Sequence, residues 1–186
     1  MMNANDGIIT TKAVREAGYH RAYLTQMVKE GLVERVSSGV YADVNIFYDD
    51  YYVFQLKHPN TYFSHNTALY FHNMTQRAPD KMDVSIVSGS NTSKINDKVR
   101  AFYCTKNNFD LGVELFRSPF GRDVRCTNLE RTLCDIIRNS KGIDQETRNK
   151  SIKEILRSGQ INEARLLSYA KTFKCLKQLM LIIDLI

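Results

Sequence analysis

The stretch TTKAVREAGYHRAYLTQMVKEG, residues 10–31, constrains the fold most, because it predicts two short helices broken at Gly18. Thr10 is a favourable N-cap residue, and glycine commonly ends a helix in the left-handed conformation. The second helix is expected over residues 20–30, and Gly31 would end it. Such a pair is either a DNA-reading helix-turn-helix or a compact helical corner.

A short hairpin is predicted directly after the helix pair. Residues 32–36 alternate apolar and polar side chains as a strand does, and residues 40–42 can pair with them. Residues 37–39, Ser-Ser-Gly, form the tight turn between the two strands. Helix, turn, helix and hairpin, in this order, outline a winged helix-turn-helix DNA-binding domain, which we expect over residues 1–43.

The second predicted helix has one apolar face and one polar face. Leu24, Met27 and Val28 follow the i, i+3, i+4 spacing of a buried face. The residues expected to contact DNA, from the other face, the flanking turns and the wing, are Thr11, His20, Arg21, Ala22, Thr25, Gln26, Lys29, Arg35, Ser37, Ser38 and Tyr41.

These side chains have the chemistry that reading a DNA duplex requires. Gln26 can form two hydrogen bonds with adenine, and Ala22 or the methyl group of Thr25 can pack on a thymine methyl. Arg21 and Lys29 suit phosphates or guanine. The serine hydroxyls of the turn suit a wing tip that contacts the DNA backbone or the minor groove.

The positive charge of the chain lies near its C-terminus. The chain carries a formal net charge of +6, but residues 1–43 hold five Lys and Arg against five Asp and Glu. Residues 138–177 hold ten Lys and Arg against four Asp and Glu. This excess suits nucleic acid, an acidic protein or simply a solvated helix face. The basic residues of this C-terminal face are Lys150, Lys153, Arg157, Lys171, Lys174 and Lys177.

Residues 44–186 predict a mixed α/β domain with a helical C-terminal half, so the fold class is α+β. A helix should follow Asp49, and a shorter one should follow Ser64 as its cap. Strands are expected mainly within residues 82–126, at 82–87, at 99–104 and as a hairpin across SPFG.

Helices are expected over residues 127–186. Thr127 and Glu130 have the T-x-x-E spacing of a capping box, and Arg131 can pair with Asp135 four residues later. Further apolar stripes include Leu166 and Leu167. The terminal LMLIIDLI is apolar almost all round, so we expect it to be buried against this chain or a partner.

The sequence supports neither catalysis nor a bound metal or cofactor. Cysteines 104, 126, 134 and 175 lack metal-ligand spacing, so reduced, partly buried thiols are expected. His65 and His72 are seven residues apart, without an acidic or thiolate partner at ligand spacing. Ser64 beside His65 suggests a hydrolase pair, but no G-x-S-x-G motif accompanies it, and capping explains Ser64 more simply.

Composition and hydropathy indicate an ordinary globular protein. Its 186 residues suffice for one or two domains, and 43% of them are apolar. No apolar run reaches the roughly 18 residues of a membrane span, and the N-terminus lacks the pattern of a secretory signal. We therefore expect a cytoplasmic location.

Four segments of the sequence resemble the AbiEi antitoxin family of bacterial abortive-infection toxin–antitoxin systems. They are GIITTKAVREAGYHRAYLTQMVKEGLVERVSSGVY, FSHNTALYFHNMTQRAPDKMDVSIVSG, SPFGRDVRCTNLERTLCDIIR and LLSYAKTFKCLKQLM, and together they span most of the chain. Within them, ERTLCDIIR and SHNTALYFHNMTQRAP are more specific than the helix pair, which many regulators share.

The resemblance implies two tasks within phage defence. The winged helix would bind inverted repeats in the promoter of its own operon, as a dimer or a cooperative pair, and repress transcription. The larger domain would act as an antitoxin against a toxin with a nucleotidyltransferase-like fold, in some systems without a stable complex. The alternative is a protein-interacting antitoxin or scaffold whose winged helix docks protein rather than DNA.

One departure from the family pattern concerns the N-terminus. Family members place a full helix before the segment that matches GIITT, whereas only MMNAND precedes it here. We therefore expect either a shortened first helix or a truncated start.

Overall fold

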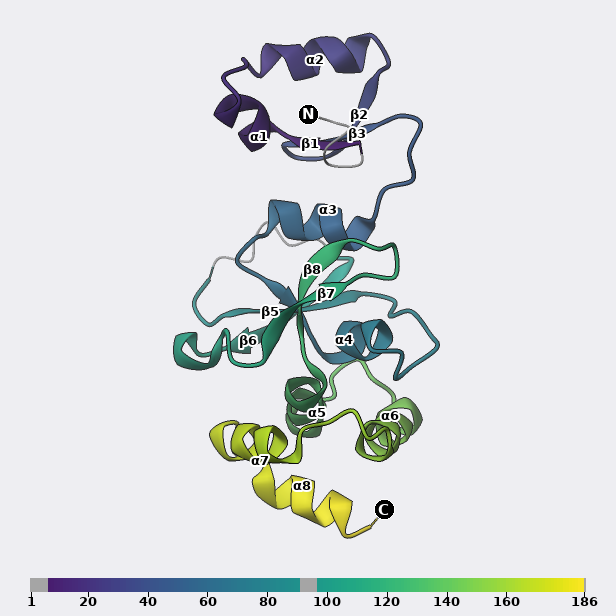
Figure 1. The fold of residues 1–186 in the computed structure, drawn as a ribbon, viewed down its shortest axis with the longest axis vertical. Helices are drawn as coiled ribbons and strands as arrows, with labels where there is room; N and C mark the ends of the chain where they lie inside the picture. Colours follow the sequence, from purple (N-terminus) through teal and green to yellow (C-terminus); the bar gives the residue numbers. More distant parts are fainter. Residues whose placement is uncertain (1–6, 91–96, 186) are drawn as a thin grey trace. The chain divides into compact units, whose positions relative to one another are not determined.

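A computed structural model describes residues 7–90 and 97–185 (Figure 1). It contains helices and two sheets, which confirms the expected α+β class. Contacts divide the chain into two compact units, Met1–Pro59 and Asn60–Ile186. The boundary therefore lies later than the expected residue 43, because the helix that follows packs on the first unit's sheet. The MMNAND segment, and with it the question of a first helix, lies outside the described residues.

The first unit is built around a small antiparallel sheet of order β1-β3-β2. Its elements are β1 (Ile8–Thr10), α1 (Thr11–Glu16), α2 (Ala22–Lys29), β2 (Val33–Ser37), β3 (Val40–Asp43) and α3 (Asp50–Lys57). Ile9 packs with Val14 of α1 and Leu24 of α2, whereas Ile8 packs with Val53 of α3. Neighbouring strand residues point to opposite faces, so α1 and α2 cover one face of the sheet and α3 covers the other.

The helix pair is broken at Gly18 as expected. Thr10 is the N-cap of α1, and its Oγ1 accepts a hydrogen bond from the backbone N–H of Ala13 at 3.1 Å. Gly18 follows α1 and Gly31 follows α2, each with positive φ. At both ends two backbone hydrogen bonds close the last turn in the pattern of a Schellman motif. The second helix starts at Ala22, slightly later than expected.

The second unit contains a five-stranded mixed sheet of order β6-β5-β4-β8-β7. Its elements are β4 (Tyr62–Phe63), α4 (His65–Phe71), β5 (Met82–Val87), β6 (Val99–Cys104), η2 (Lys106–Asn108), β7 (Val113–Arg117), β8 (Asp123–Thr127), α5 (Leu129–Arg138), α6 (Gln145–Arg157), α7 (Glu163–Thr172) and α8 (Leu176–Ile183). The expected strands at 82–87 and 99–104 and the expected hairpin are confirmed as β5 to β8. Strand β4 was not expected, because two residues are too few to show alternation.

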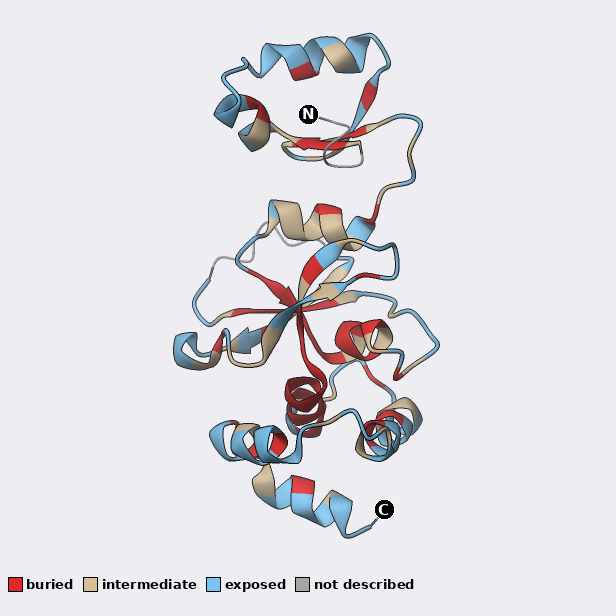
Figure 2. Cartoon of the chain, viewed as in Figure 1, coloured by how far each residue is buried: buried red, intermediate tan, exposed pale blue. Residues whose placement is uncertain are grey.

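Helix α5 is the centre of the second unit's core. Residues 129–137 are all buried, and the helix is red in Figure 2. Leu133 and Ile136 pack in one cluster with Ile155 of α6, Leu166 of α7 and Leu179 of α8. A helix that is buried all round also carries its polar side chains into the interior, where each of them needs hydrogen-bond partners.

Two expected helix caps are wrong in detail. Asn128, not Thr127, caps α5, because its Oδ1 accepts from the N–H of Arg131 at 3.0 Å. Thr127 belongs to strand β8, and Glu130 accepts instead from the N–H of Asn162 at 2.7 Å. Ser64 precedes α4 but makes no side-chain cap, since its hydroxyl is bonded within the core. The Asp49 cap of α3 is confirmed.

The C-terminal stretch is less buried than expected. Leu179 is fully buried, but Leu181 is 56% exposed and Leu185 is 83% exposed. Leu167 of α7 and Val28 of α2, which the sequence also placed on buried faces, are 40% and 39% exposed. Helix α8 packs on α5 and α7, and its Leu181 and Ile183 side chains stay exposed.

Candidate nucleic-acid interface

One face of helix α2 is exposed and carries polar side chains. Ala22, Thr25, Gln26 and Lys29 are all exposed. Leu24, on the opposite side, is only 1% exposed and anchors the helix to Ile9 and Val14. Figure 2 shows this arrangement as a mostly pale-blue helix with one buried patch. The sequence therefore placed the polar face of α2 correctly, and the structure brings these four residues together.

The start of α2 is open to solvent. Arg21 is the N-cap residue, but its side chain makes no capping hydrogen bond. Instead the Nδ1 of His20 accepts a hydrogen bond from the backbone N–H of Ala22 at 3.2 Å. The exposed Arg21 guanidinium therefore lies at the helix N-terminus, where the helix dipole also favours an anion such as phosphate.

An exposed tyrosine pair beside this helix start was missed by the sequence analysis. Tyr19 and Tyr23 are 56% and 60% exposed. Their rings meet edge to face, with centroids 5.9 Å apart. Two aromatic residues four apart across a helix start are the signal that points to this contact. Tyrosine hydroxyls on this flank are suitable donors to phosphate oxygens.

Gln26 is held by a neighbour on the same face. Its Nε2 donates a hydrogen bond to the Oε1 of Glu30 at 2.7 Å. Both side chains are exposed and lie one helical turn apart. The contact fixes the orientation of the Gln26 amide and also places a carboxylate on the edge of the polar face.

The hairpin after α2 is tied to the start of α1. The backbone N–H of Thr11 donates to the carbonyl of Gly39 at 2.9 Å, and Gly39 has φ of +76°. A bulge between Arg35 and Ser37 shifts the register of β2 against β3. Ser38 is exposed at the turn, and Arg35 is exposed on the strand.

Three predicted contact residues are partly covered: Thr11, Ser37 and Tyr41. Thr11 is half-buried beneath the turn, and Tyr41 is half-buried against Ile9, Val14 and Leu24. Tyr41 lies directly opposite Arg35 across the two strands. Its position makes it a support for the hairpin rather than its tip.

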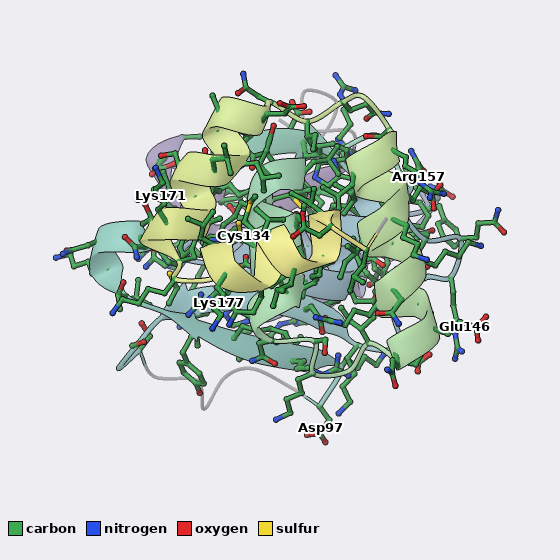
Figure 3. The ribbon with its side chains drawn as sticks, turned by 90° about the horizontal axis from the view of Figure 1, so that it is seen from below. Asp97, Cys134, Glu146, Arg157, Lys171 and Lys177 are labelled. Atoms are coloured by element: carbon green, nitrogen blue, oxygen red, sulfur yellow. The ribbon has the colours of Figure 1, made fainter. Side chains whose placement is uncertain are left out.

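The six basic residues of the C-terminal face are all exposed and come from three helices and a connecting turn. Lys150, Lys153 and Arg157 lie on α6, Lys171 lies on α7 and Lys177 lies on α8, with Lys174 between the last two helices. Figure 3 labels Arg157, Lys171 and Lys177 on three separate helices. Lys150 lines a hollow beside residues 73–77, whereas Lys153 lines a groove beside α8. Lys150 and Lys153 therefore face different hollows, although both lie on α6.

The Ser64 and His65 pair is enclosed. The Ser64 Oγ lies 2.9 Å from the His65 Nδ1 and 2.8 Å from the Ser85 Oγ, but Ser64 has no exposed surface and His65 only 4%. The His65 ring stacks on Phe102 with centroids 3.5 Å apart. Burial and the nearby arginine charges lower the pKa of His65 to about 3, so the ring is neutral at pH 7. The pair packs the core and offers no path for a substrate.

Arg131 organises a second buried cluster. Its Nε donates to both carboxylate oxygens of Asp135 at 3.0 Å, and the pairing predicted from their spacing is thus present, but buried. Its other nitrogens donate to the carbonyls of Asn108 and Leu111 and to the hydroxyl of Tyr62. Burial raises the pKa of Asp135, and the adjacent guanidinium opposes that rise. Every Arg131 nitrogen has a partner, so this cluster is structural.

The described residues hold no other arrangement typical of a catalytic or metal site. Glu130 pairs with Arg165 at 2.8 Å, whereas Asp135 pairs with Arg131, so the two carboxylates point to different partners. Within residues 7–90 and 97–185 no three His, Cys, Asp or Glu side chains are grouped as metal ligands. In the same ranges, every helix is too short or too polar to cross a membrane.

Comparison with known proteins gives information on the fold and on the family of residues 4–42. No curated protein matches the sequence of the chain. The crystal structure of the RV2827C protein from Mycobacterium tuberculosis shares the fold, with a TM-score of 0.62 at 13% sequence identity over 89% of this chain. The chain covers 66% of the length of that protein. Residues 4–42 match the model of a family described as a transcriptional regulator, AbiEi antitoxin, which confirms the resemblance to that family for this segment.

Proposed function

We propose that this protein is the antitoxin of a bacterial abortive-infection toxin–antitoxin system and represses its own operon. The observation that carries the proposal is the exposed polar face of α2, within a segment that matches a transcriptional regulator family. The helix pair and the hairpin act as a winged helix-turn-helix. In that geometry α2 is the recognition helix and enters the major groove of double-stranded DNA.

Each exposed side chain has a distinct role in this proposal. Gln26 reads adenine, Ala22 and Thr25 pack on thymine methyl groups, and Lys29 and Arg21 bind phosphate or guanine. His20 supports the start of the helix through its hydrogen bond to Ala22. These contacts give sequence preference, because base edges in the major groove differ from one base pair to the next.

The wing extends the contact along the duplex. Ser37, Ser38 and Arg35 reach the DNA backbone or the minor groove beside the recognition helix, while Thr11 and Tyr41 hold the hairpin in place. The promoter target consists of inverted repeats, so two protomers bind, as a dimer or as a cooperative pair.

The second unit carries the antitoxin activity in this proposal. Its functional partner is a toxin with a nucleotidyltransferase-like fold. The enclosed Ser64–His65 pair and the saturated Arg131 cluster support a role without catalysis. The side chains proposed to contact an anionic partner are exposed; they are Lys150, Lys153, Arg157, Lys171, Lys174 and Lys177.

A second candidate is a winged helix that docks protein rather than DNA. The exposed Tyr19 and Tyr23 pair and the exposed Val28 favour it, since apolar surface on a small domain commonly marks a protein contact. The formal neutrality of residues 1–43 also fits this candidate better than a purely electrostatic DNA site.

A reporter gene behind the protein's own promoter separates these candidates. The proposal expects repression by the native chain and its loss in Arg21→Ala/Gln26→Ala, at unchanged protein level. The matched control is Gln76→Ala/Lys81→Ala, which changes the same kinds of exposed residue in the second unit and should repress normally. A reporter that the native chain leaves fully active would contradict the repressor function and favour protein docking.

A further inference from the structure

A groove separates helices α6 and α8 in the second unit. Its volume is about 270 Å³, and its lining consists of Arg148, Asn149, Ile152, Lys153, Ile182 and Leu185. Seen from below, α8 crosses beneath α5, with α7 on one side and α6 on the other (Figure 3). Helix α8 packs mainly on α5 and α7, and the groove lies between it and α6.

Part of the apolar surface in and beside the groove is exposed to solvent. Ile152 forms a buried floor at 3% exposure, and Ile182 is half-buried beside it. Leu185 is 83% exposed, and Leu181, one helical turn earlier, is 56% exposed. An exposed apolar patch that adjoins a groove and has polar residues at its edge typically marks a protein contact.

The charges at the groove are of one sign. Arg148 and Lys153 line it, and no acidic residue does. Lys153 is exposed, whereas Arg148 is half-buried and donates from its Nε to the carbonyl oxygen of Ile136 at 3.2 Å and from its Nη1 to the Oδ1 of Asn149 at 3.5 Å. The acids of α6, Glu146 and Glu154, line the separate hollow beside residues 73–77, together with Lys150. The groove thus combines an apolar floor with a basic edge formed by Arg148 and Lys153.

These features select one kind of occupant. The volume of about 270 Å³ lies at the lower end of the roughly 300–1,000 Å³ typical of small-molecule sites and accommodates a few inserted side chains. A groove between two helices is typical of helix-in-groove recognition, in which apolar residues at i and i+4 insert. A second copy of this chain would bring the same basic edge to the contact, and like charges there would repel.

We propose that the groove between α6 and α8 binds an amphipathic helical segment of a partner protein, with an apolar face and acidic flanks. Ile152, Ile182 and Leu185 receive the apolar side chains. Arg148 and Lys153 pair with the acidic flanks. This inference goes beyond the proposed DNA binding and does not rest on it.

Two labelled peptides test the proposal by fluorescence anisotropy against the full chain. Both are helices of about 16 residues with leucines at i and i+4; one has glutamate flanks and the other lysine flanks. The glutamate peptide should bind saturably and at least about tenfold more tightly than the lysine peptide. Leu185→Asp should abolish this binding, whereas Met180→Asp, the same change outside the groove lining, should leave it intact.

Charge reversal supplies an independent readout. Lys153→Glu should weaken the binding of the glutamate peptide and tighten the binding of the lysine peptide. Lys150→Glu, three residues earlier on the same helix but lining the other hollow, should change neither. Promoter binding should survive Leu185→Asp, and peptide binding should survive Arg21→Ala/Gln26→Ala, so the two proposals fail separately.

Three results would overturn the proposal. The first is the absence of saturable peptide binding, or equal binding of both peptides. The second is self-association that Leu185→Asp abolishes, which would assign the groove to a second copy. The third is sequence-independent DNA binding that Lys153→Glu abolishes and Arg21→Ala/Gln26→Ala does not, which would assign this surface to nucleic acid.

Discussion

The amide Nε2 of Gln26 donates a hydrogen bond to the carboxylate Oε1 of Glu30 at 2.7 Å, one turn along the exposed face of α2. This contact uses one of the two amide hydrogens. The second hydrogen and the amide oxygen remain for the N7 and N6 positions of an adenine. Glu30 therefore positions the side chain that is proposed to read the base, but its negative charge lies close to where phosphates would bind.

Removing the Glu30 carboxylate should change the affinity for any DNA and the preference for promoter DNA in opposite directions. In Glu30→Ala the binding of scrambled DNA should tighten, because one repulsion between the helix and the phosphates is lost. The preference for promoter over scrambled DNA should fall, because Gln26 is no longer oriented. Glu16→Ala removes an exposed acid from α1 instead and should leave the preference unchanged. An unaltered preference in Glu30→Ala would show that the contact has no role in base reading.

Leu24 and Gln26 lie on opposite sides of α2 and should respond differently to truncation. Leu24→Ala should lower the free energy of unfolding of the first unit by about 2–5 kcal/mol, because Leu24 is buried among Ile9 and Val14. Gln26→Ala should change it by less than about 0.5 kcal/mol, since that side chain is exposed. Amide hydrogen exchange within the first unit measures both values. A large destabilisation by Gln26→Ala would mean that lost DNA binding reports folding rather than contact.

Asp83 should make stability depend on pH in a narrow range. Burial raises its pKa to about 6, despite the opposing charge of Arg100 at 3.0 Å. A raised folded-state pKa means that the folded chain binds the proton more tightly than the unfolded chain. The resulting stability is complete below about pH 4 and is lost as the pH rises through about 6.

The pH effect is measured by comparison with Asp83→Asn. Between pH 4 and pH 6.5 the unfolding free energy of the native chain should fall relative to that of the variant by up to about 2–3 kcal/mol. The control is Asp80→Asn, whose side chain is 81% exposed and paired with Arg77. A difference that stays constant with pH would contradict the assigned pKa.

Arg131 should not tolerate lysine. Lysine retains the charge but cannot supply the planar set of donors that reaches Asp135, Tyr62 and the carbonyls of Asn108 and Leu111. Arg131→Lys should therefore lower the unfolding free energy of the second unit by about 2–4 kcal/mol in urea titrations. Arg138→Lys, exposed at the end of the same helix, should have a small effect. Equal effects of the two variants would show that Arg131 acts only through its charge.

The first unit was largely predictable because its signals are local. Thr10, Gly18 and Gly31 set the helix ends through their own backbone preferences, and the apolar spacing of α2 placed Leu24 inside. The spacing could not reveal that Val28 remains 39% exposed, since burial depends on which neighbours cover that side. The boundary of the unit was likewise hidden, because α3 joins it only through tertiary packing of Val53.

The second unit was less predictable because its polar contacts connect distant segments. Nothing in the spacing of Glu130 indicates a bond to Asn162, thirty-two residues later, so a local capping box was the simpler expectation. Ser64 was assigned to a cap for the same reason, whereas its hydroxyl meets Ser85 on a neighbouring strand. Leu185 shows the opposite case, because its apolar segment predicted burial and the side chain is 83% exposed. The sequence alone does not show whether this chain or a partner protein covers such a segment.

The most direct test of the account is a titration of the purified chain against a labelled fragment of its own promoter and a scrambled fragment. Comparing the affinities at about 50 and about 200 mM salt gives the electrostatic contribution to DNA binding. We predict tighter binding to the promoter than to the scrambled fragment at both salt concentrations. In Arg21→Ala/Gln26→Ala this preference should be lost, and loss of the base contact should weaken the binding free energy for the promoter by about 1–3 kcal/mol. Equal, weak binding to both fragments, unchanged by the double substitution, would contradict it.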